Sequence, residues 1–270
     1  MVLHPFTTAP VQGASERYIP VWSAIEAAQQ RRDQDYWLVS QPDHAALSGD
    51  LAGNIVSPML PQLTPDAVQA IALHDAGWSI LPSEKDPTTP PLLREDGTPL
   101  SFLEIAPADF TRAWIASIDL GEEVSALGGL MVSGHFVRIA KMRLEQKEDA
   151  PEDTRLLRAF IDQERIRRER LEPLTHLPAD EIKLFTDVLQ FCDVLSLYLC
   201  CGSTAQVEFP QEFSGRRIRV RRVGDVIRCD PSPFRREGHP DDGLSLGVRA
   251  GRYPHSDAAA NFVALPLLLS

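Results

Sequence analysis

Several patterns that reveal the chemistry of a protein are missing from this chain. It contains no G-x-S-x-G nucleophile elbow, no phosphate-binding P-loop and no G-x-G-x-x-G dinucleotide fingerprint. Its four cysteines form no C-x-x-C pair, so the patterns of a zinc ribbon and of a thioredoxin-like redox site are both absent. Cys192, Cys200 and Cys201 lie in or beside one apolar segment, as buried free thiols of a reducing compartment do.

Positive charge and long hydrophobic runs are also scarce. The chain has 27 Lys and Arg against 38 Asp and Glu, a net charge of −11, which is unsuited to broad binding of a nucleic-acid backbone. Its most apolar run, Val188–Cys201, is interrupted by Asp193 and falls short of the roughly 20 residues that span a bilayer. The first residues lack the basic start and apolar core of a signal peptide. We therefore expect a cytoplasmic protein without a membrane segment.

The pattern of apolar residues divides the chain into three parts. Residues 1–35 are predicted to be an irregular N-terminal arm, without periodicity over residues 1–20 and with room for a short helix within Ile19–Gln30. Residues 36–202 carry helical patterns, and residues 203–270 alternate charged and aliphatic side chains, as in Arg216–Val223, which is typical of half-exposed strands. The predicted fold is mainly α, a helical bundle with a small C-terminal antiparallel β appendage, α+β overall and packed as one compact unit.

Helix signals place the polar residues of interest. Pro42-Asp43 begins a helix that carries His44, and Thr64-Pro65-Asp66 is a strong helix start, with a cap residue and a proline at the first helical position. The pair His74-Asp75 falls near the end of that second helix, with Gly77 as its stop. The proline-rich residues 79–101 are predicted to be a loop that acts as a lid or binds substrate.

Five ionisable side chains lie in apolar surroundings, where they are costly unless paired or bound to a metal. Asp193 shares one helix seam with Gln190 and Ser196, and the others are His44, His74, Asp75 and His135. Each taken alone has a structural explanation: a core histidine with a satisfied hydrogen bond, or a buried salt bridge. Taken together, groups from four predicted helices favour a single buried metal centre.

The predicted metal ligands are therefore His44, His74, Asp75, His135 and Asp193. Imidazole and carboxylate suit Mn, Fe, Zn, Co or Ni, and carboxylates also suit Mg, so one or two divalent ions are expected. Asp75 is also a candidate catalytic residue. Glu104, which follows the long loop, is a second candidate as an acid, a base or an extra ligand. No chemical role is predicted for His4, His176, His239 and His255, which lie by prolines or in polar segments.

The order His44, His74-Asp75, Asp193 resembles the HD-domain superfamily of metal-dependent phosphohydrolases. That resemblance implies that these four residues bind metal and that His135 occupies a position where two-metal members place an additional histidine. Four blocks extend the likeness to a bacterial family of uncharacterised HD-like proteins: Gln41–Ala52, His74–Trp78, Ser133–Phe136 and Phe191–Cys201.

The expected function is that of a metal-dependent hydrolase acting on a small phosphate ester through a metal-activated water. Lys85, Arg94 or Arg158 would hold the phosphate. Two alternatives remain open at this point: a di-iron oxygenase of the HD type, and a non-catalytic metal-binding or scaffold protein. The sequence names neither the substrate nor the metal, and it leaves a homo-oligomer open.

Overall fold

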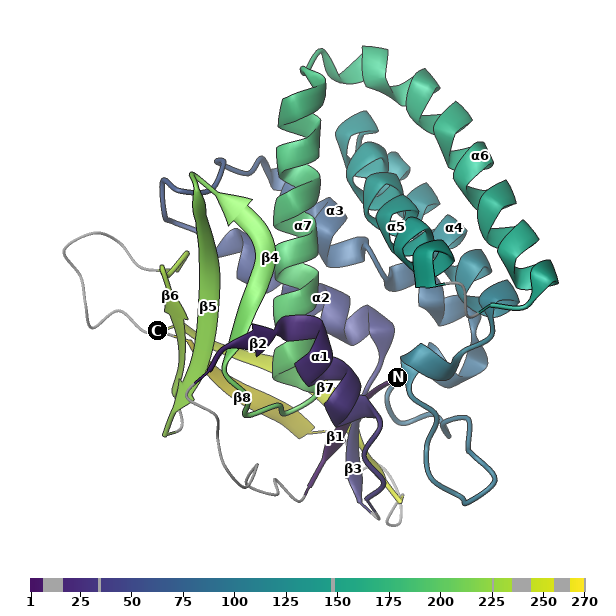
Figure 1. The fold of residues 1–270 in the computed structure, drawn as a ribbon, viewed down its shortest axis with the longest axis vertical. Coiled ribbons are helices and arrows are strands. Elements are labelled where there is room, and N and C mark those ends of the chain that lie inside the picture. The colour runs from purple at the N-terminus through teal and green to yellow at the C-terminus, as the bar shows by residue number, and fades with distance from the viewer. Residues whose placement is uncertain are drawn as a thin grey trace.

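One long helix runs through the middle of the protein. The computed structural model describes residues 1–6, 17–33, 35–146, 149–224, 226–234, 244–254 and 263–269, the last range by its backbone alone. Helix α7 (Ala179–Cys200) lies between a curved β-sheet and the other long helices (Figure 1). Most of its side chains are buried, including all of Phe191–Cys200. The prediction of a buried core helix is confirmed.

Helix boundaries follow the cap signals. The helices are α1 (Val21–Gln29), α2 (Gln41–Gly53), α3 (Pro65–Leu73), α4 (Pro107–Val124), α5 (Ala126–Gln146), α6 (Pro151–Thr175) and α7, with short 3-10 turns η1 (Ala76–Ile80), η2 (Pro82–Glu84) and η3 (Phe102–Glu104). The side chains of Ser40 and Thr64 cap α2 and α3 by accepting hydrogen bonds from backbone N–H groups three residues ahead. Cap residues therefore fix where α2, which carries His44, and α3, which ends just before His74, begin.

The strands form one eight-stranded sheet in the order β1-β3-β7-β8-β6-β5-β4-β2. Their bounds are β1 (Val2–Pro5), β2 (Ile19–Pro20), β3 (Tyr36–Val39), β4 (Val207–Phe213), β5 (Arg216–Val223), β6 (Val226–Asp230), β7 (Leu244–Tyr253) and β8 (Val263–Leu269). The α+β class with a C-terminal β region is confirmed. The sheet is wider than predicted, because N-terminal strands join it, and it is mixed, because β2–β4 and β6–β8 are parallel pairs.

The N-terminal part departs from the predicted irregular arm. Val2 and Leu3 are fully buried in β1, which pairs with β3, and α1 packs against α7 and β1. Helix α1 agrees with the short helix expected within Ile19–Gln30. The strands β1 and β2 are too short for periodicity to reveal, and long-range pairing stabilises them. Residues 7–16 and 34 of the arm lie outside the described residues. The division into three parts stays a prediction.

The cysteines of the chain lie in its core. All four cysteines are free and buried, as predicted. Among the described helices, none is long and apolar enough to cross a membrane. The strongly charged segment 154–170 lies in α6, where Arg165 and Arg168 pair with acids four residues ahead, a pattern typical of a solvated helix face.

A close crossing brings helices α2 and α3 together. Gly49 of α2 faces Ala72 of α3, and a Cβ atom at Gly49 would come within 2.4 Å of the Ala72 Cβ. Gly77 has a comparable role: a Cβ there would lie 2.3 Å from the Ala113 carbonyl oxygen of α4. Gly77 was expected to stop the helix. Instead it lies within η1 and allows η1 to approach α4 closely.

The crossing yields a test of packing. We expect Gly49→Ala to lower the free energy of unfolding by about 1–3 kcal/mol, because the new methyl group overpacks the contact with Ala72. Gly53→Ala is a matched control on the same helix, since its Cβ would lie 3.7 Å from the nearest atom, Cγ1 of Val68. The control should change stability by less than about 1 kcal/mol. Urea unfolding measures both, and a Gly49→Ala variant as stable as the native protein would contradict the close crossing.

Candidate metal centre

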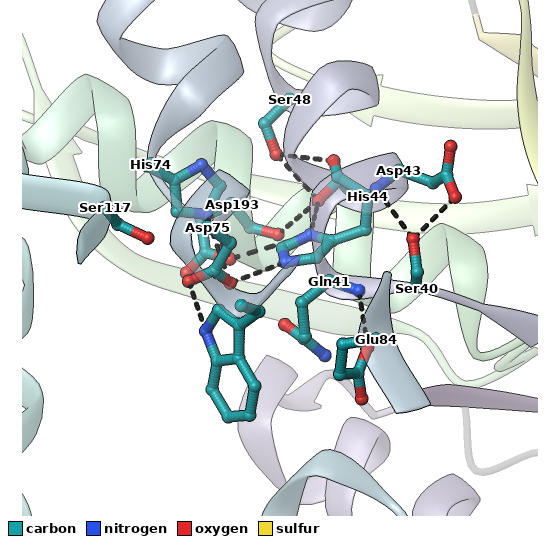
Figure 2. A network of polar contacts seen from close by, with 12 residues as sticks. Ser40, Gln41, Asp43, His44, Ser48, His74, Asp75, Glu84, Ser117 and Asp193 are labelled. Atoms are coloured by element: carbon teal, nitrogen blue, oxygen red, sulfur yellow. Dashed lines mark hydrogen bonds and ion pairs between the residues drawn. The ribbon is translucent and has the colours of Figure 1, made fainter. Parts of the chain in front are cut away.

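Four buried side chains meet where α2, the end of α3 and α7 converge (Figure 2). His44 and His74 are 0% exposed, Asp75 is 6% exposed and Asp193 is 3% exposed. One ligand atom from each residue lies within 4.8 Å of the others, so the cluster can hold a metal ion. The structure therefore brings together four of the five predicted ligands.

The His74-Asp75 pair sits differently from the prediction. Helix α3 ends at Leu73, His74 is its C-cap, and Asp75 leaves the helical conformation with φ −117° and ψ 12°. The Asp75 carboxylate is held by the indole of Trp78, whose Nε1–H donates to Oδ1 over 2.8 Å. Both side chains thus point into the cluster because the chain turns at Asp75, just after the end of α3.

Hydrogen bonds fix the ring nitrogens of both histidines. His74 Nδ1–H donates to the carbonyl oxygen of Ile71 over 2.8 Å, and a carbonyl can only accept. The Ser196 hydroxyl donates to the Asp193 carbonyl oxygen, so His44 Nδ1–H donates to Ser196 Oγ over 2.8 Å. In the neutral form of each ring, Nε2 therefore keeps its lone pair. This arrangement is typical of metal-ligating histidines, which donate their other N–H to a neighbouring acceptor.

The free ring nitrogens face the two carboxylates. His44 Nε2 lies 2.8 Å from Asp75 Oδ2, and His74 Nε2 lies 3.4 Å from Asp193 Oδ1. Adjacent ligands of one ion with bonds of about 2.1 Å are separated by roughly 3.0 Å in an octahedron and roughly 3.4 Å in a tetrahedron. These two separations lie close to those values, while His74 Nε2 and Asp75 Oδ2 are farther apart, at 3.7 Å. Lone pairs facing carboxylate oxygens repel unless a cation, either a proton or a metal ion, lies between them.

Electrostatics of the metal-free cluster follow from the same geometry. Burial lowers the pKa of His74, but Asp75 and Asp193 outweigh it and raise that pKa to about 9. Burial likewise favours the neutral form of Asp193, yet the hydrogen bond from His74 and the nearby imidazoles hold the pKa of Asp193 below its ordinary value. Without a metal, a proton on His74 is therefore the cation that the carboxylates share.

His135 and Glu104 lie apart from the four-residue cluster. His135 Nε2 is 3.8 Å from Asp193 Oδ2, and its Nδ1 is buried without a hydrogen-bond partner among the described residues. Burial lowers the pKa of His135 to about 4, so its ring is neutral. The Glu104 carboxylate instead forms an ion pair with Arg94 and accepts a hydrogen bond from the Ser101 N–H. Its position gives Glu104 a structural role and no support as a catalytic group.

Two hollows that share lining residues border the cluster. The smaller, about 110 Å³, is lined by Asp75, His135 and Asp193 together with several aromatic side chains. The larger, about 650 Å³, shares Trp22, His135, Ile139 and Asp193 with the first. Trp78 and Trp114, both buried, are among the aromatic side chains that line the smaller hollow. The carboxylates are thus reachable from a pocket rather than sealed on all sides.

The long loop is fastened to the sheet. Tyr253 of β7 donates a hydrogen bond to the Gly97 carbonyl oxygen over 2.6 Å, and Arg249 pairs with Asp86. Its irregular character over residues 79–101 is confirmed apart from the turns η1 and η2. No residue of the loop lines the smaller hollow, although Trp78 before the loop and Phe102 and Leu103 after it do. A lid role therefore has no support in this placement.

Several pocket residues were not found from the sequence. Lys85, Arg94 and Arg158 were the expected phosphate-binding residues, and none lines either hollow. Arg143 lines the smaller hollow and Arg138 the larger. Gln41, at the start of α2, also lines the smaller one. A signal for Arg138 and Arg143 was present, because both share a helix with His135, at spacings of three and eight residues.

The fold and the site define an α+β protein with a buried His/Asp cluster that can hold a metal ion. The chain belongs to the family described as "Protein of unknown function (DUF3891)", which matches residues 29–239 and so includes the whole cluster. No curated protein and no solved structure matches the chain.

The proton shared by the metal-free cluster gives a pH test. The folded pKa of His74, about 9, exceeds its unfolded value near 6.5, so its stabilising contribution is complete below pH 6.5 and is lost as the pH rises through 9. We measure the free energy of unfolding in the presence of chelator at about pH 7 and about pH 10. The decrease between these two pH values should be larger for the native protein than for His74→Asn, by on the order of 1–3 kcal/mol. Urea unfolding at the two pH values measures this, and equal slopes would contradict it.

Proposed function

We propose that this protein is a metal-dependent hydrolase that acts on a phosphate ester, and that it belongs to the HD-domain superfamily. The observation that carries the proposal is the paired arrangement of His44 and His74. Both rings donate Nδ1–H to fixed acceptors and direct Nε2 toward buried carboxylates that border a pocket. The order His44, His74-Asp75, Asp193 along the chain, which resembles that superfamily, supports the same conclusion.

His44, His74, Asp75 and Asp193 would hold the ion. When bound, a divalent metal would lower the pKa of a coordinated water toward neutrality and polarise a phosphoryl oxygen. Two imidazoles among four protein ligands favour Mn, Fe, Co, Ni or Zn over Mg, which prefers oxygen. His135, 3.8 Å from Asp193 Oδ2, is the described residue best placed to help hold a second ion.

The chain's own residues prepare the hydrolytic step. Trp78 Nε1–H occupies Asp75 Oδ1, so the carboxylate is held in one orientation, and its Oδ2 faces the cluster. Asp75 is therefore positioned to orient a water and to take its proton. The water oxygen forms a new bond to phosphorus, the ester P–O bond breaks, and the leaving alcohol receives a proton. Arg138, at the edge of the larger hollow, is the candidate to hold the phosphate.

A di-iron oxygenase is the second candidate, and one observation favours it. The His135 Nδ1 atom is buried without a partner in the described part of the chain, and its other nitrogen lies beside Asp193. Two irons per chain, with a mixed-valence spectroscopic signal, would select the oxygenase. Mn, Zn or Mg would select hydrolysis. The adjoining pocket counts against a purely structural metal centre, which would have a closed coordination sphere.

Elemental analysis of protein purified without chelator tests the metal centre. We expect at least about one divalent ion per chain, and a loss of about tenfold or more in metal affinity for His74→Ala and for Asp193→Asn. His176→Asn is a matched control, because His176 is exposed and its left-handed backbone (φ 54°) tolerates asparagine. Metal-free native protein, or unchanged metal content in His74→Ala, would contradict the proposal.

Hydrolysis has its own test. The metal-loaded protein should release 4-nitrophenol from 4-nitrophenyl phosphate, and the rate should fall by about 100-fold or more in Asp75→Asn, because that variant cannot accept the proton of water. Restored metal with no release from any phosphate ester would rule out the phosphohydrolase while leaving the metal centre intact.

A further inference from the structure

The smaller hollow has an aromatic wall. Six aromatic side chains line it: Trp22, Trp78, Phe102, Phe110, Trp114 and Phe136. Trp114 stacks on Phe136 with ring centroids 5.0 Å apart, and it also meets Phe110 at 4.4 Å. The rings therefore form a rigid, preformed surface. Its volume of about 110 Å³ is on the scale of the cavities that accept a single benzene ring.

Only a few polar side chains are among the described residues that line this hollow. Asp75, His135 and Asp193 mark the metal end. Gln41 is 1% exposed, and its Nε2 has no hydrogen-bond partner among the residues the structure describes. A buried donor without an acceptor is destabilising, so such a group is a candidate to bind a ligand oxygen. The Gln41 backbone N–H is fixed by Glu84 Oε2 over 3.0 Å, and this contact holds the start of α2 in place (Figure 2).

Positive charge is sparse along this wall. Of the described residues that line the smaller hollow, only Arg143 is a lysine or arginine. Its guanidinium already pairs with Asp149 and lies over the Phe110 ring at 4.9 Å. A ligand with several phosphates needs several cations to balance its charge. The hollow is therefore suited to an apolar, ring-sized group and not to a polyphosphate chain.

We propose that the substrate is a phosphate monoester of an aromatic or similarly compact apolar alcohol. Its ring lies against the aromatic wall, its phosphate lies at the metal end, and Gln41 Nε2–H donates a hydrogen bond to an oxygen of the ester. This inference rests on the proposed phosphohydrolase function and specifies the substrate class of the same site.

Binding of two non-hydrolysable probes tests the inference without measuring activity. Phenylphosphonate and methylphosphonate carry the same anion and differ by a ring. We expect phenylphosphonate to bind the metal-loaded protein about tenfold more tightly or better, because its ring buries apolar area against other rings. Calorimetry gives both affinities. Tryptophan emission reports the location, since three of the four tryptophans line the hollow.

Variants connect the ring preference to this wall. Phe102 is half-buried, so Phe102→Ala and Trp22→Ala should reduce the preference about threefold or more without unfolding the protein, as circular dichroism will verify. Trp37→Ala is the matched control, because Trp37 is also half-buried but packs on Phe6 of another surface. Gln41→Leu should weaken both phosphonates severalfold and leave the ring preference unchanged.

The outcomes separate this inference from the function on which it rests. Equal affinity for the two phosphonates, or a ring preference that survives both aromatic substitutions, would overturn the substrate class and leave the phosphohydrolase standing. Unchanged binding by Gln41→Leu would overturn the assigned hydrogen bond. Failure of both phosphonates to bind the metal-loaded protein would overturn the phosphohydrolase and the substrate class together.

Discussion

Two buried carboxylates that face imidazole lone pairs are the constraint on which this structure depends. In the described part of the chain, the ion pairs of Asp75 and Asp193 are all with histidines. The Nδ1–H of His44 and of His74 is already donated elsewhere. Burying two negative charges is expensive without compensation, so the cluster requires a cation at its centre. A proton on His74 supplies it in the metal-free protein, and a divalent metal would supply it better, because one ion could attract all four side chains.

The surrounding fold serves to keep this arrangement in place. Helix α7 brings Asp193 and Ser196 into the middle of the molecule, and the crossing at Gly49 holds α2 against α3. The turn after α3 directs Asp75 inward, and Trp78 fixes its carboxylate. The aromatic hollow opens on the same carboxylates, so the protein combines a polar centre with an apolar wall in one pocket. This combination suits a substrate with a charged head and a ring-sized body.

Local signals in the sequence predicted much of this. Thr64-Pro65 located the start of α3, and the cost of burying Asp193 in an apolar helix marked it as a candidate ligand, which the structure places in the cluster that could hold a metal ion. What could not be predicted depends on contacts between distant segments. Strand β4 was missed because Pro210 interrupts its pattern and its register with β5 shifts between Glu208 and Glu212. No local pattern in the sequence points to Gln41 as a binding residue. Only the folded structure shows that its side-chain amide is buried without a hydrogen-bond partner among the described residues.

The most direct test of the metal centre is an anomalous-diffraction measurement on crystals of protein purified without chelator, recorded at the absorption edge of the metal found in it. We predict an anomalous peak about 2.0–2.2 Å from Nε2 of His44, Nε2 of His74 and an oxygen of each of Asp75 and Asp193. Direct hydrogen bonds between these imidazoles and carboxylates, with no anomalous peak among them, would contradict it.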